Sequence, residues 1–392
     1  MDRRLWVMVF SMAGFDPLTG YCRKIGMAVN VITASLPKIY PWPLQCSFPK
    51  SFLTIQRSVR SQMMRWVGIV GLQNIVAATL FMATFTPAVS AENPTVSSNI
   101  RWAYPVLKEK TPYPKLEPTV EYTVKGSIRV LTGDQLNLMD DPVDWTPSEH
   151  PVPPKIVAHD DRDRKLEACG ACHGMKGQGG IDVPDIGGLP ANYIAEQLHE
   201  FAKGRRRSSD PDRDVSGRMA AFASKLSESE IRDAARYFSS VTRSPLPVRV
   251  IEAERVPATR ANHDWLELVP GGVSEPIGRR VIEVAEDFNQ MWIGDPNSGI
   301  EAYVPTGAIA RGKALVHHGA NPCITCHGPT LRGVGKVPPL AGRAPYSLAR
   351  AIWDIKSGAR NGAAVSLMKK PASELTADQI VDVVAYLASL TP

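Results

Sequence analysis

Two segments late in the chain share one pattern of apolar and polar positions. Each opens on a hydroxyl residue, Ser227 or Thr376, which is followed three positions later by Glu230 or Gln379. This spacing is typical of a helix N-terminus at which two side chains reciprocally satisfy backbone N–H groups. Apolar residues then recur at helical spacing, namely Ile231, Ala234, Ala235 and Phe238 in the first segment and Ile380, Val383, Val384 and Leu387 in the second. The pattern predicts one amphipathic helix in each segment.

The same order of features continues upstream of both helices. Further amphipathic helices are predicted over Tyr193–Lys203 and Tyr346–Lys356, each preceded by a Val-Pro turn. In each copy a methionine stands seven residues before a leucine and eighteen before a tyrosine. These residues are Met219, Leu226 and Tyr237 in one copy and Met368, Leu375 and Tyr386 in the other. The chain therefore contains an internal repeat of one structural unit.

The regions around the repeats have a different pattern. Residues 244–305 contain β-type segments such as Arg280–Val284, with turns at Gly271-Gly272, and predict a small β-containing insert. Residues 92–154 are Pro-rich and have few apolar runs, so we expect an extended arm lying over the first unit rather than a separate core.

The two copies also differ just before their cysteine motifs. The first copy has the polar stretch Asp160–Lys165 there, so no clear apolar helix is predicted. The second copy has a better candidate over Ile309–Val316, in which Gly312 is available for close contact with another helix.

The N-terminal 91 residues have the pattern of a secretory leader. An apolar run over Trp66–Thr86 follows three arginines and ends before small residues that lead to Ala91. This predicts a signal peptide cleaved after Ala91, with a start near Met63 or Met64 and no evident role for residues 1–62. The alternative is an uncleaved membrane anchor, since the run is near the length that spans a bilayer. Gln73, Asn74 and the cleavage site favour removal, and hence a periplasmic protein that contacts the membrane only if the leader stays uncleaved.

Removal of this leader changes the charge of the chain. The whole sequence has 45 Lys and Arg against 39 Asp and Glu, a net charge of +6. Residues 1–91 hold nine of the former and two of the latter, which leaves 36 against 37 and a net charge of about −1. The high isoelectric point is therefore mostly due to the leader and gives no reason to expect a nucleic-acid partner.

The candidate chemistry lies in two C-x-x-C-H pentapeptides. They are Cys169-Gly170-Ala171-Cys172-His173 and Cys323-Ile324-Thr325-Cys326-His327. Paired cysteines at this spacing can form thioethers to haem vinyl groups, and the following histidine can coordinate the iron, so the pair predicts two covalently bound haem c groups. A four-cysteine zinc site would leave both histidines unexplained, and a redox dithiol would require a βαβ context that neither motif has. The two other cysteines, Cys22 and Cys46, lie in the leader.

With these motifs in place, the chain resembles the class I cytochrome c family in its tandem two-haem periplasmic form. The resemblance covers residues 155–243 and 306–392. It implies an all-α fold, with two haem domains in tandem separated by the insert and preceded by the Pro-rich arm. It also implies His173 and His327 as proximal iron ligands, and Met219 and Met368 as distal ligands. Tyr237 and Tyr386 fall where the family packs a C-terminal-helix aromatic against the N-terminal helix.

The distal assignment can also be weighed by elimination. A chain that begins at Glu92 has five methionines, at positions 139, 175, 219, 291 and 368. Met175 follows His173 too closely to reach the opposite haem face, and Met139 and Met291 lie outside the repeats. Met291 is expected to be core filler. Among histidines, His317 and His318 are expected on the exposed side of a helix, and His199 could be a distal ligand only if Met219 is not.

The segment Lys203–Arg207 is the most basic stretch outside the leader. Two interpretations stay open. It could be a docking patch for an acidic redox partner, or a solvated loop after a helix C-terminus, where cations suit the helix dipole.

An iron with both axial sites filled is suited to electron transfer rather than substrate turnover. The sequence thus predicts a non-enzymatic periplasmic electron carrier. It would take electrons from a periplasmic dehydrogenase or a quinol-oxidising cytochrome complex and pass them toward a terminal oxidase. The alternative is a di-haem enzyme, such as a cytochrome c peroxidase or a thiosulfate-oxidising cytochrome. A sensor or structural module has no positive feature in the sequence.

Overall fold

The computed structural model describes residues 115–210, 215–262, 265–269 and 271–392. The predicted leader, residues 1–91, and the first part of the arm, residues 92–114, lie outside these ranges. Within the described ranges, no helix combines the length and apolar character that crossing a bilayer requires.

The described part of the first haem unit contains five helices. They are α3 (Lys155–Ala158), α4 (Cys169–His173), α5 (Ala191–Ala202), α6 (Val215–Ala223) and α7 (Glu228–Ser240). The capping pair Ser227 and Glu230 is confirmed at the start of α7, where each side chain accepts an N–H of the other residue. The apolar face of α7 includes Ala234 and Phe238 and lies in a cluster with Ile156 and Val157 of α3. Even this four-residue helix therefore contributes to the core of the first unit.

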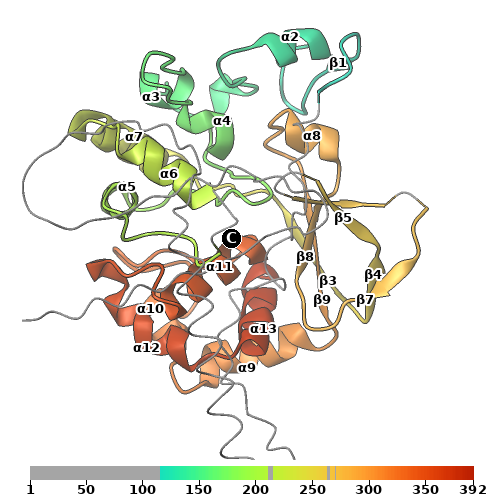
Figure 1. Ribbon diagram of the computed structural model, residues 1–392, viewed down its shortest axis with the longest axis vertical. Helices are drawn as coiled ribbons and strands as arrows, with labels where there is room; N and C mark the ends of the chain where they lie inside the picture. The colour runs from blue at the N-terminus through green and yellow to red at the C-terminus, as the bar shows by residue number, and fades with distance from the viewer. Residues whose placement is uncertain (1–114, 211–214, 263–264, 270) are drawn as a thin grey trace, which may run out of the picture. The chain divides into compact units, whose positions relative to one another are not determined.

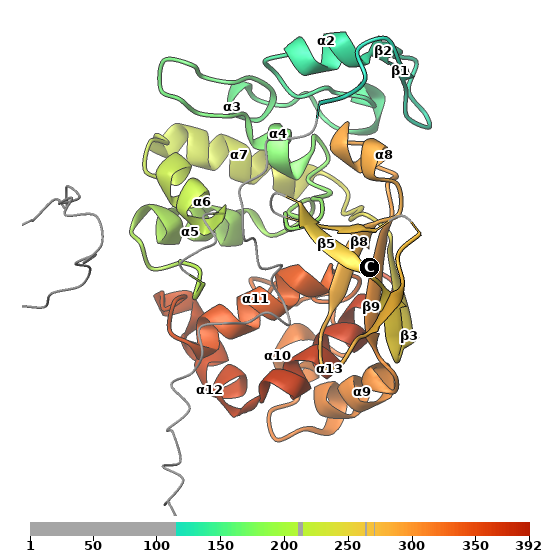
Figure 2. The same ribbon diagram turned by 45° about the vertical axis from the view of Figure 1, so that its right-hand side comes forward.

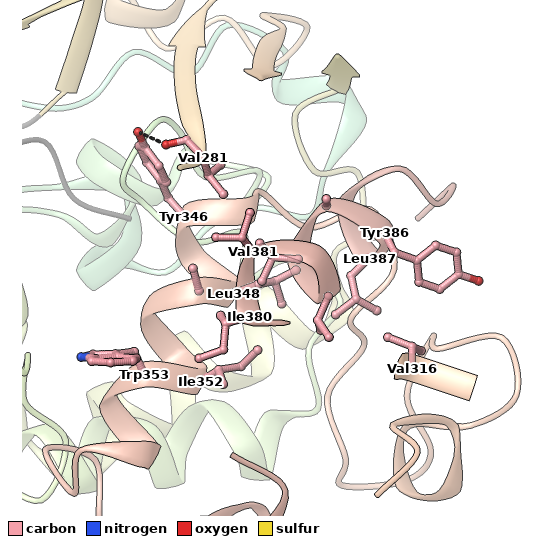
Figure 3. Packing of buried hydrophobic residues seen from close by; sticks show 14 of the residues in the cluster. Val281, Val316, Tyr346, Leu348, Ile352, Trp353, Ile380, Val381, Tyr386 and Leu387 are labelled. Carbon is pink, nitrogen blue, oxygen red and sulfur yellow. Dashed lines mark hydrogen bonds between the residues drawn. The ribbon is translucent and has the colours of Figure 1, made fainter. Parts of the chain in front are cut away.

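The second haem unit repeats this order with a longer first helix. Its elements are α9 (Ala308–His318), α10 (Ile324–His327), α11 (Pro345–Lys356), η2 (Ala363–Val365), α12 (Ser366–Glu374) and α13 (Ala377–Ala388). The predicted capping pair Thr376 and Gln379 is confirmed at the start of α13. The predicted close helix contact at Gly312 is confirmed as well, because a Cβ at Gly312 would lie 1.9 Å from the Asp382 carbonyl oxygen of α13. Ile352, Ile380 and Leu387 belong to the apolar cluster between the helices of this unit (Figure 3).

The segment between the units is more extensively β-structured than the sequence predicted. Five strands form one sheet in the order β3-β9-β8-β6-β5. They are β3 (Val248–Ala253), β5 (Thr259–Asn262), β6 (Trp265–Leu268), β8 (Ile282–Ala285) and β9 (Ile300–Pro305). A separate ribbon joins β4 (Arg255–Pro257) to β7 (Ser274–Pro276), and α8 (Phe288–Trp292) lies between β8 and β9 in the chain. The all-α description therefore fits the two haem units and not the chain as a whole (Figure 1).

The sheet is continuous with the second haem unit. Val281 and Val304 belong to the same apolar cluster as the helices of that unit. The Tyr346 hydroxyl of α11 donates to the Val281 carbonyl oxygen at 3.2 Å (Figure 3). The carboxylate of Glu283, which is fully buried on β8, accepts the Tyr346 N–H. The strands thus support the helix that follows the second haem motif.

The described part of the arm contains β1 (Glu121–Tyr122), β2 (Leu131–Thr132), α2 (Gly133–Leu138) and η1 (Pro147–Glu149). It contacts the first unit through the ion pair of Lys176 and Glu149 at 2.6 Å. It also forms a small apolar cluster that includes Ile293, which follows α8. Trp145 lies in this cluster and donates its indole N–H to the Ile293 carbonyl oxygen at 2.7 Å. Figure 2 shows the arm beside α8 and above α4. The arm therefore bridges the first unit and the insert.

Candidate haem-binding sites

The two histidines of the C-x-x-C-H motifs have the same local environment. His173 Nδ1 lies 3.0 Å from the Pro184 carbonyl oxygen, and His327 Nδ1 lies 2.9 Å from the Pro338 carbonyl oxygen. A carbonyl can only accept, so in both rings Nδ1 carries the proton and Nε2 keeps its lone pair. Burial lowers the pKa of each histidine, which keeps the imidazole neutral. A neutral ring with a fixed tautomer is the form that binds a metal.

The loop that holds each proline is also the same in both units. The N–H of Gly179 donates to the His173 carbonyl oxygen at 3.0 Å, and Gly333 donates to His327 at 3.0 Å. Both glycines have positive φ, of 79° and 83°. A Cβ at either position would lie within 2.6 Å of a valine carbonyl oxygen of the same loop. Only glycine fits here without strain, so the Gly-rich stretch after each motif serves to bring the Val-Pro turn back over the histidine.

The predicted site residues of the first unit line one cavity of about 710 Å³. They are Cys169, Cys172, His173 and Met219. Most of the other lining residues from this unit are apolar, and they include Leu189, Ile194 and Phe222. The shared cavity, its apolar lining and the thioether-forming and iron-binding donor set fit a covalently attached haem.

In the second unit the predicted residues gather on one apolar cluster. Cys323 and Met368 are half-buried and pack against the cluster that contains Ile352 and Val384. His327 is buried, whereas Cys326 is exposed. The donor set and its order along the chain match those of the first unit, so the same group fits both.

The competing chemistries of a C-x-x-C pair have no support in the structure. Burial raises the pKa of Cys169 to about 12 and also raises the pKa values of Cys172 and Cys323. A redox-active dithiol needs the thiolate, which a raised pKa disfavours. Within the described ranges, no group of three or more His, Cys, Asp or Glu side chains could hold a metal ion.

The other candidate ligands have different surroundings. His199 of α5 pairs with the exposed Glu228 of α7 at 3.1 Å. His317 is half-buried and its Nε2 lies 2.9 Å from the Tyr386 hydroxyl, so the expectation that it is exposed was wrong; His318 is exposed, as expected. Met291 packs in an apolar cluster with Ile181 and Leu246, as expected of core filler, although it also lines the cavity.

The sequence did not reveal two contributions to these sites. The first is the pair of carbonyl groups, at Pro184 and Pro338, that orient the histidines, although the Val-Pro turns themselves were recognised. The second is the share of the first cavity that comes from outside the first unit. Trp265, Phe288 and Trp292 of the insert line it, as do Arg343 and Arg360 of the second unit. Only the three-dimensional fold brings these residues to the cavity.

The fold and the paired sites define a c-type cytochrome with two haem units. The cytochrome c family profile matches residues 165–242 and 309–391. The chain is 32% identical over 77 residues to cytochrome c-554(548) of Halomonas halodenitrificans, and this match covers 87% of that protein and 19% of this chain. The chain therefore belongs to the cytochrome c family.

Two further relatives match over more of the chain. The thiosulfate dehydrogenase electron acceptor of Thiomonas intermedia is 28% identical over 225 residues, which is 57% of this chain and 78% of that protein. Cytochrome c4 of Pseudomonas aeruginosa is 22% identical over 235 residues, 58% of this chain and 85% of that protein. The chain is thus a di-haem class I c-type cytochrome, similar to electron carriers of the cytochrome c4 type, and its cofactors are two covalently bound haem c groups.

Proposed function

We propose that this protein carries single electrons and that both of its haems have histidine and methionine as axial ligands. The observation that supports this most directly is the duplication of the site. Each unit pairs an Nδ1-bonded histidine with a methionine in the same register, and in the first unit both side chains line one cavity. The thioethers would form at Cys169, Cys172, Cys323 and Cys326, the proximal ligands would be His173 and His327, and the distal ligands would be Met219 and Met368.

A haem c with both axial positions filled takes up and releases one electron without binding substrate. The residues of the chain set the conditions for this. The hydrogen bond from Nδ1 to a proline carbonyl holds each imidazole in one orientation and makes Nε2 more basic. The apolar lining excludes water, and the methionine thioether raises the reduction potential relative to a second histidine.

We also propose the domain organisation in which this function would operate. It comprises a leader over residues 1–91, an arm over 92–154, haem domains over 155–243 and 306–392, and an insert over 244–305. With the leader removed, the protein would work in the periplasm. Its partners would be a periplasmic dehydrogenase or a quinol-oxidising complex on one side and a terminal oxidase on the other. Relatives from Thiomonas intermedia and Stutzerimonas stutzeri are named thiosulfate dehydrogenase electron acceptor, which favours a thiosulfate dehydrogenase as the donor.

The test is optical spectroscopy of the purified two-haem protein, oxidised and reduced, with and without carbon monoxide. We expect a methionine–iron charge-transfer band in the oxidised protein and no carbon monoxide binding to the reduced protein. Rapid carbon monoxide binding at one haem of the unaltered protein would overturn the carrier function in favour of a di-haem enzyme, such as a peroxidase or a thiosulfate-oxidising cytochrome.

Single substitutions assign the distal ligands. Met219→Ala and Met368→Ala should each remove about half of the charge-transfer band, lower the potential of one haem and allow carbon monoxide to bind there. Met291→Ala is the matched control, because Met291 lines the same cavity as Met219 but lies outside the repeat. If Met291→Ala removed the band and Met219→Ala left it intact, the distal assignment in the first unit would be wrong.

A further inference from the structure

The basic segment Lys203–Arg207 is only partly exposed, because Arg205 and Arg206 are half-buried whereas Lys203 and Arg207 are exposed. Its backbone pairs with the loop that follows α11 in the second unit. Arg207 N–H donates to the Ala359 carbonyl oxygen at 3.0 Å, and Asn361 N–H donates to the Arg205 carbonyl oxygen at 2.9 Å. These bonds place Arg206 directly opposite Arg360 in an isolated β-bridge. Two guanidinium groups are thereby held together at the boundary between the units.

Both arginines line the first haem cavity. Arg206 donates to the Gln197 side-chain oxygen at 3.0 Å, and Arg360 donates to the same oxygen at 2.9 Å. Arg360 also donates to the Tyr193 hydroxyl at 3.1 Å. Two cations therefore share neutral partners, an arrangement that leaves their positive charge uncompensated.

Other cavity-lining arginines of the second unit are compensated by carboxylates of the first unit. Arg343 Nε lies 3.1 Å from Asp185, and Arg350 pairs with Asp182. Among the described residues, Arg206 and Arg360 form no ion pair with a carboxylate. Asp354 attracts Arg206 at longer range, and its carboxylate accepts the Ser209 N–H at 2.9 Å.

The local electrostatics agree with an excess of positive charge. Burial and the neighbouring Arg360 lower the pKa of Arg206 to about 9, so the group still carries its charge at neutral pH. Burial alone would raise the pKa of Tyr193, but Arg360, Arg206 and Arg343 together lower it to about 8. Arg360 is only 6% exposed, and its Nε is buried without a hydrogen-bond partner. A buried cation with an unused donor on a cavity wall indicates an anionic ligand.

We infer that Arg206 and Arg360 together bind a propionate carboxylate of the first haem, so that the second unit completes the haem site of the first. A guanidinium donates two parallel hydrogen bonds to a carboxylate, and two such groups across one carboxylate neutralise it where water is excluded. The consequence is electrostatic: the paired cations stabilise the reduced form of the first haem and so raise its reduction potential. This inference requires haem at the first motif and does not require methionine ligation.

The test is a redox titration of the two-haem protein with Arg206→Gln and Arg360→Gln. We expect both substitutions to move the same one of the two reduction steps to a lower potential. At a fixed potential the ratio of reduced to oxidised first haem should fall on the order of tenfold. Arg205→Gln is the matched control, because it makes the same charge change on the same loop at a side chain that pairs with Glu200 instead. It should move neither step comparably.

Two further measurements distinguish propionate binding from a loss of packing around the two arginines. The carboxylate bands in the infrared difference spectrum should shift in Arg206→Gln and Arg360→Gln but not in Arg205→Gln, which a loss of packing alone would not produce. Arg360→Lys, which keeps the charge, should retain most of the potential. Haem content measured in each variant shows whether haem attachment at the first motif has failed. The inference is wrong if Arg206→Gln and Arg360→Gln retain two haems and shift neither reduction step more than Arg205→Gln does. It is also wrong if the two variants shift different reduction steps.

Discussion

The two haem units have the same histidine loop but close their N-terminal sides in different ways. In the second unit, the eleven-residue helix α9 packs against α13, and the Tyr386 hydroxyl lies 2.9 Å from His317 Nε2 of α9. In the first unit, α3 has only four residues. Tyr237, which corresponds to Tyr386 in the repeat, donates to the Met175 carbonyl oxygen at 2.7 Å. Its hydroxyl also lies 3.1 Å from His150 of the arm. The arm thus occupies part of the place that a longer helix fills in the second unit.

This difference shows that the histidine loop is common to both haem sites, whereas the packing behind the loop differs between them. The loop between each motif and its Val-Pro turn is held by short-range bonds, from Gly179 to His173 and from Gly333 to His327. These bonds depend on residues within a few positions of each other, so they form in both units whatever packs behind them. The packing behind them can then come from a helix or from an arm.

The largest expected effect comes from Gly312, where the second unit depends on close helix contact. Gly312→Ala places a methyl group 1.9 Å from the Asp382 carbonyl oxygen, so α9 and α13 must separate. We expect a loss of about 3 kcal/mol in the free energy of unfolding, at the upper end of overpacking costs. Urea denaturation followed by circular dichroism measures this change.

Lys313→Ala, at the next and exposed position of α9, serves as the control and should have little effect. An equally stable Gly312→Ala protein would mean that the second unit does not depend on this helix contact, and the contrast with the first unit would lose its basis.

Sequence reasoning succeeded where structure is specified locally. The capping pairs at Ser227 and Thr376 and the contact at Gly312 could be predicted, because each depends on neighbouring residues or on one helical face. The five-stranded sheet was underestimated, because its order joins strands from both ends of the insert and local periodicity does not encode such pairing.

The roles of single polar residues were harder to predict. The sequence does not reveal whether Arg206 faces solvent or an interface. The three-dimensional pairing of Arg206 with Arg360 shows that it lies at an interface. His317 was expected on an exposed face because the sequence does not reveal which side of α9 meets Tyr386. The prediction that Met219 and Met368 are distal iron ligands rests on the repeat, because the two methionines occupy the same position in the two copies.

A smaller effect is expected from removing the hydroxyl of each tyrosine in turn. Tyr237→Phe leaves the Met175 carbonyl oxygen without this buried donor, so we expect a loss of about 2 kcal/mol in unfolding free energy. Tyr386→Phe removes a bond to the half-buried His317, which water can replace in part, and should cost less than about 1 kcal/mol. Equal losses in the two urea titrations would contradict the conclusion that the arm and the longer helix support their units differently.

The smallest effect concerns an arginine–carboxylate pair that links the N-terminal segment to the C-terminal helix in each unit. Arg311 binds Asp382 in the second unit through two bonds of 2.8 and 2.9 Å, and Asp382 is buried. Arg164 binds Glu230 in the first unit at 2.6 and 3.1 Å, where both side chains are partly exposed. Hydrogen bonds from Arg164 lower the pKa of Glu230 to about 2 from its usual 4.5.

A depressed carboxyl pKa stabilises the folded state above pH 4.5, and this contribution is lost as the pH falls toward 2. Glu230→Gln should therefore be less stable than the unaltered protein at pH 7, by about 1 kcal/mol once solvent screening of the exposed pair is included. The difference between the two proteins should shrink steadily below pH 4.5. Glu228→Gln removes a charge from the same helix turn together with the exposed contact to His199, so it controls for the helix dipole and should show a smaller difference at pH 7. If the Glu230→Gln difference were the same at pH 3 and pH 7, the pair would not stabilise the first unit through its charge, and the resemblance to the buried Arg311–Asp382 pair would be one of geometry alone.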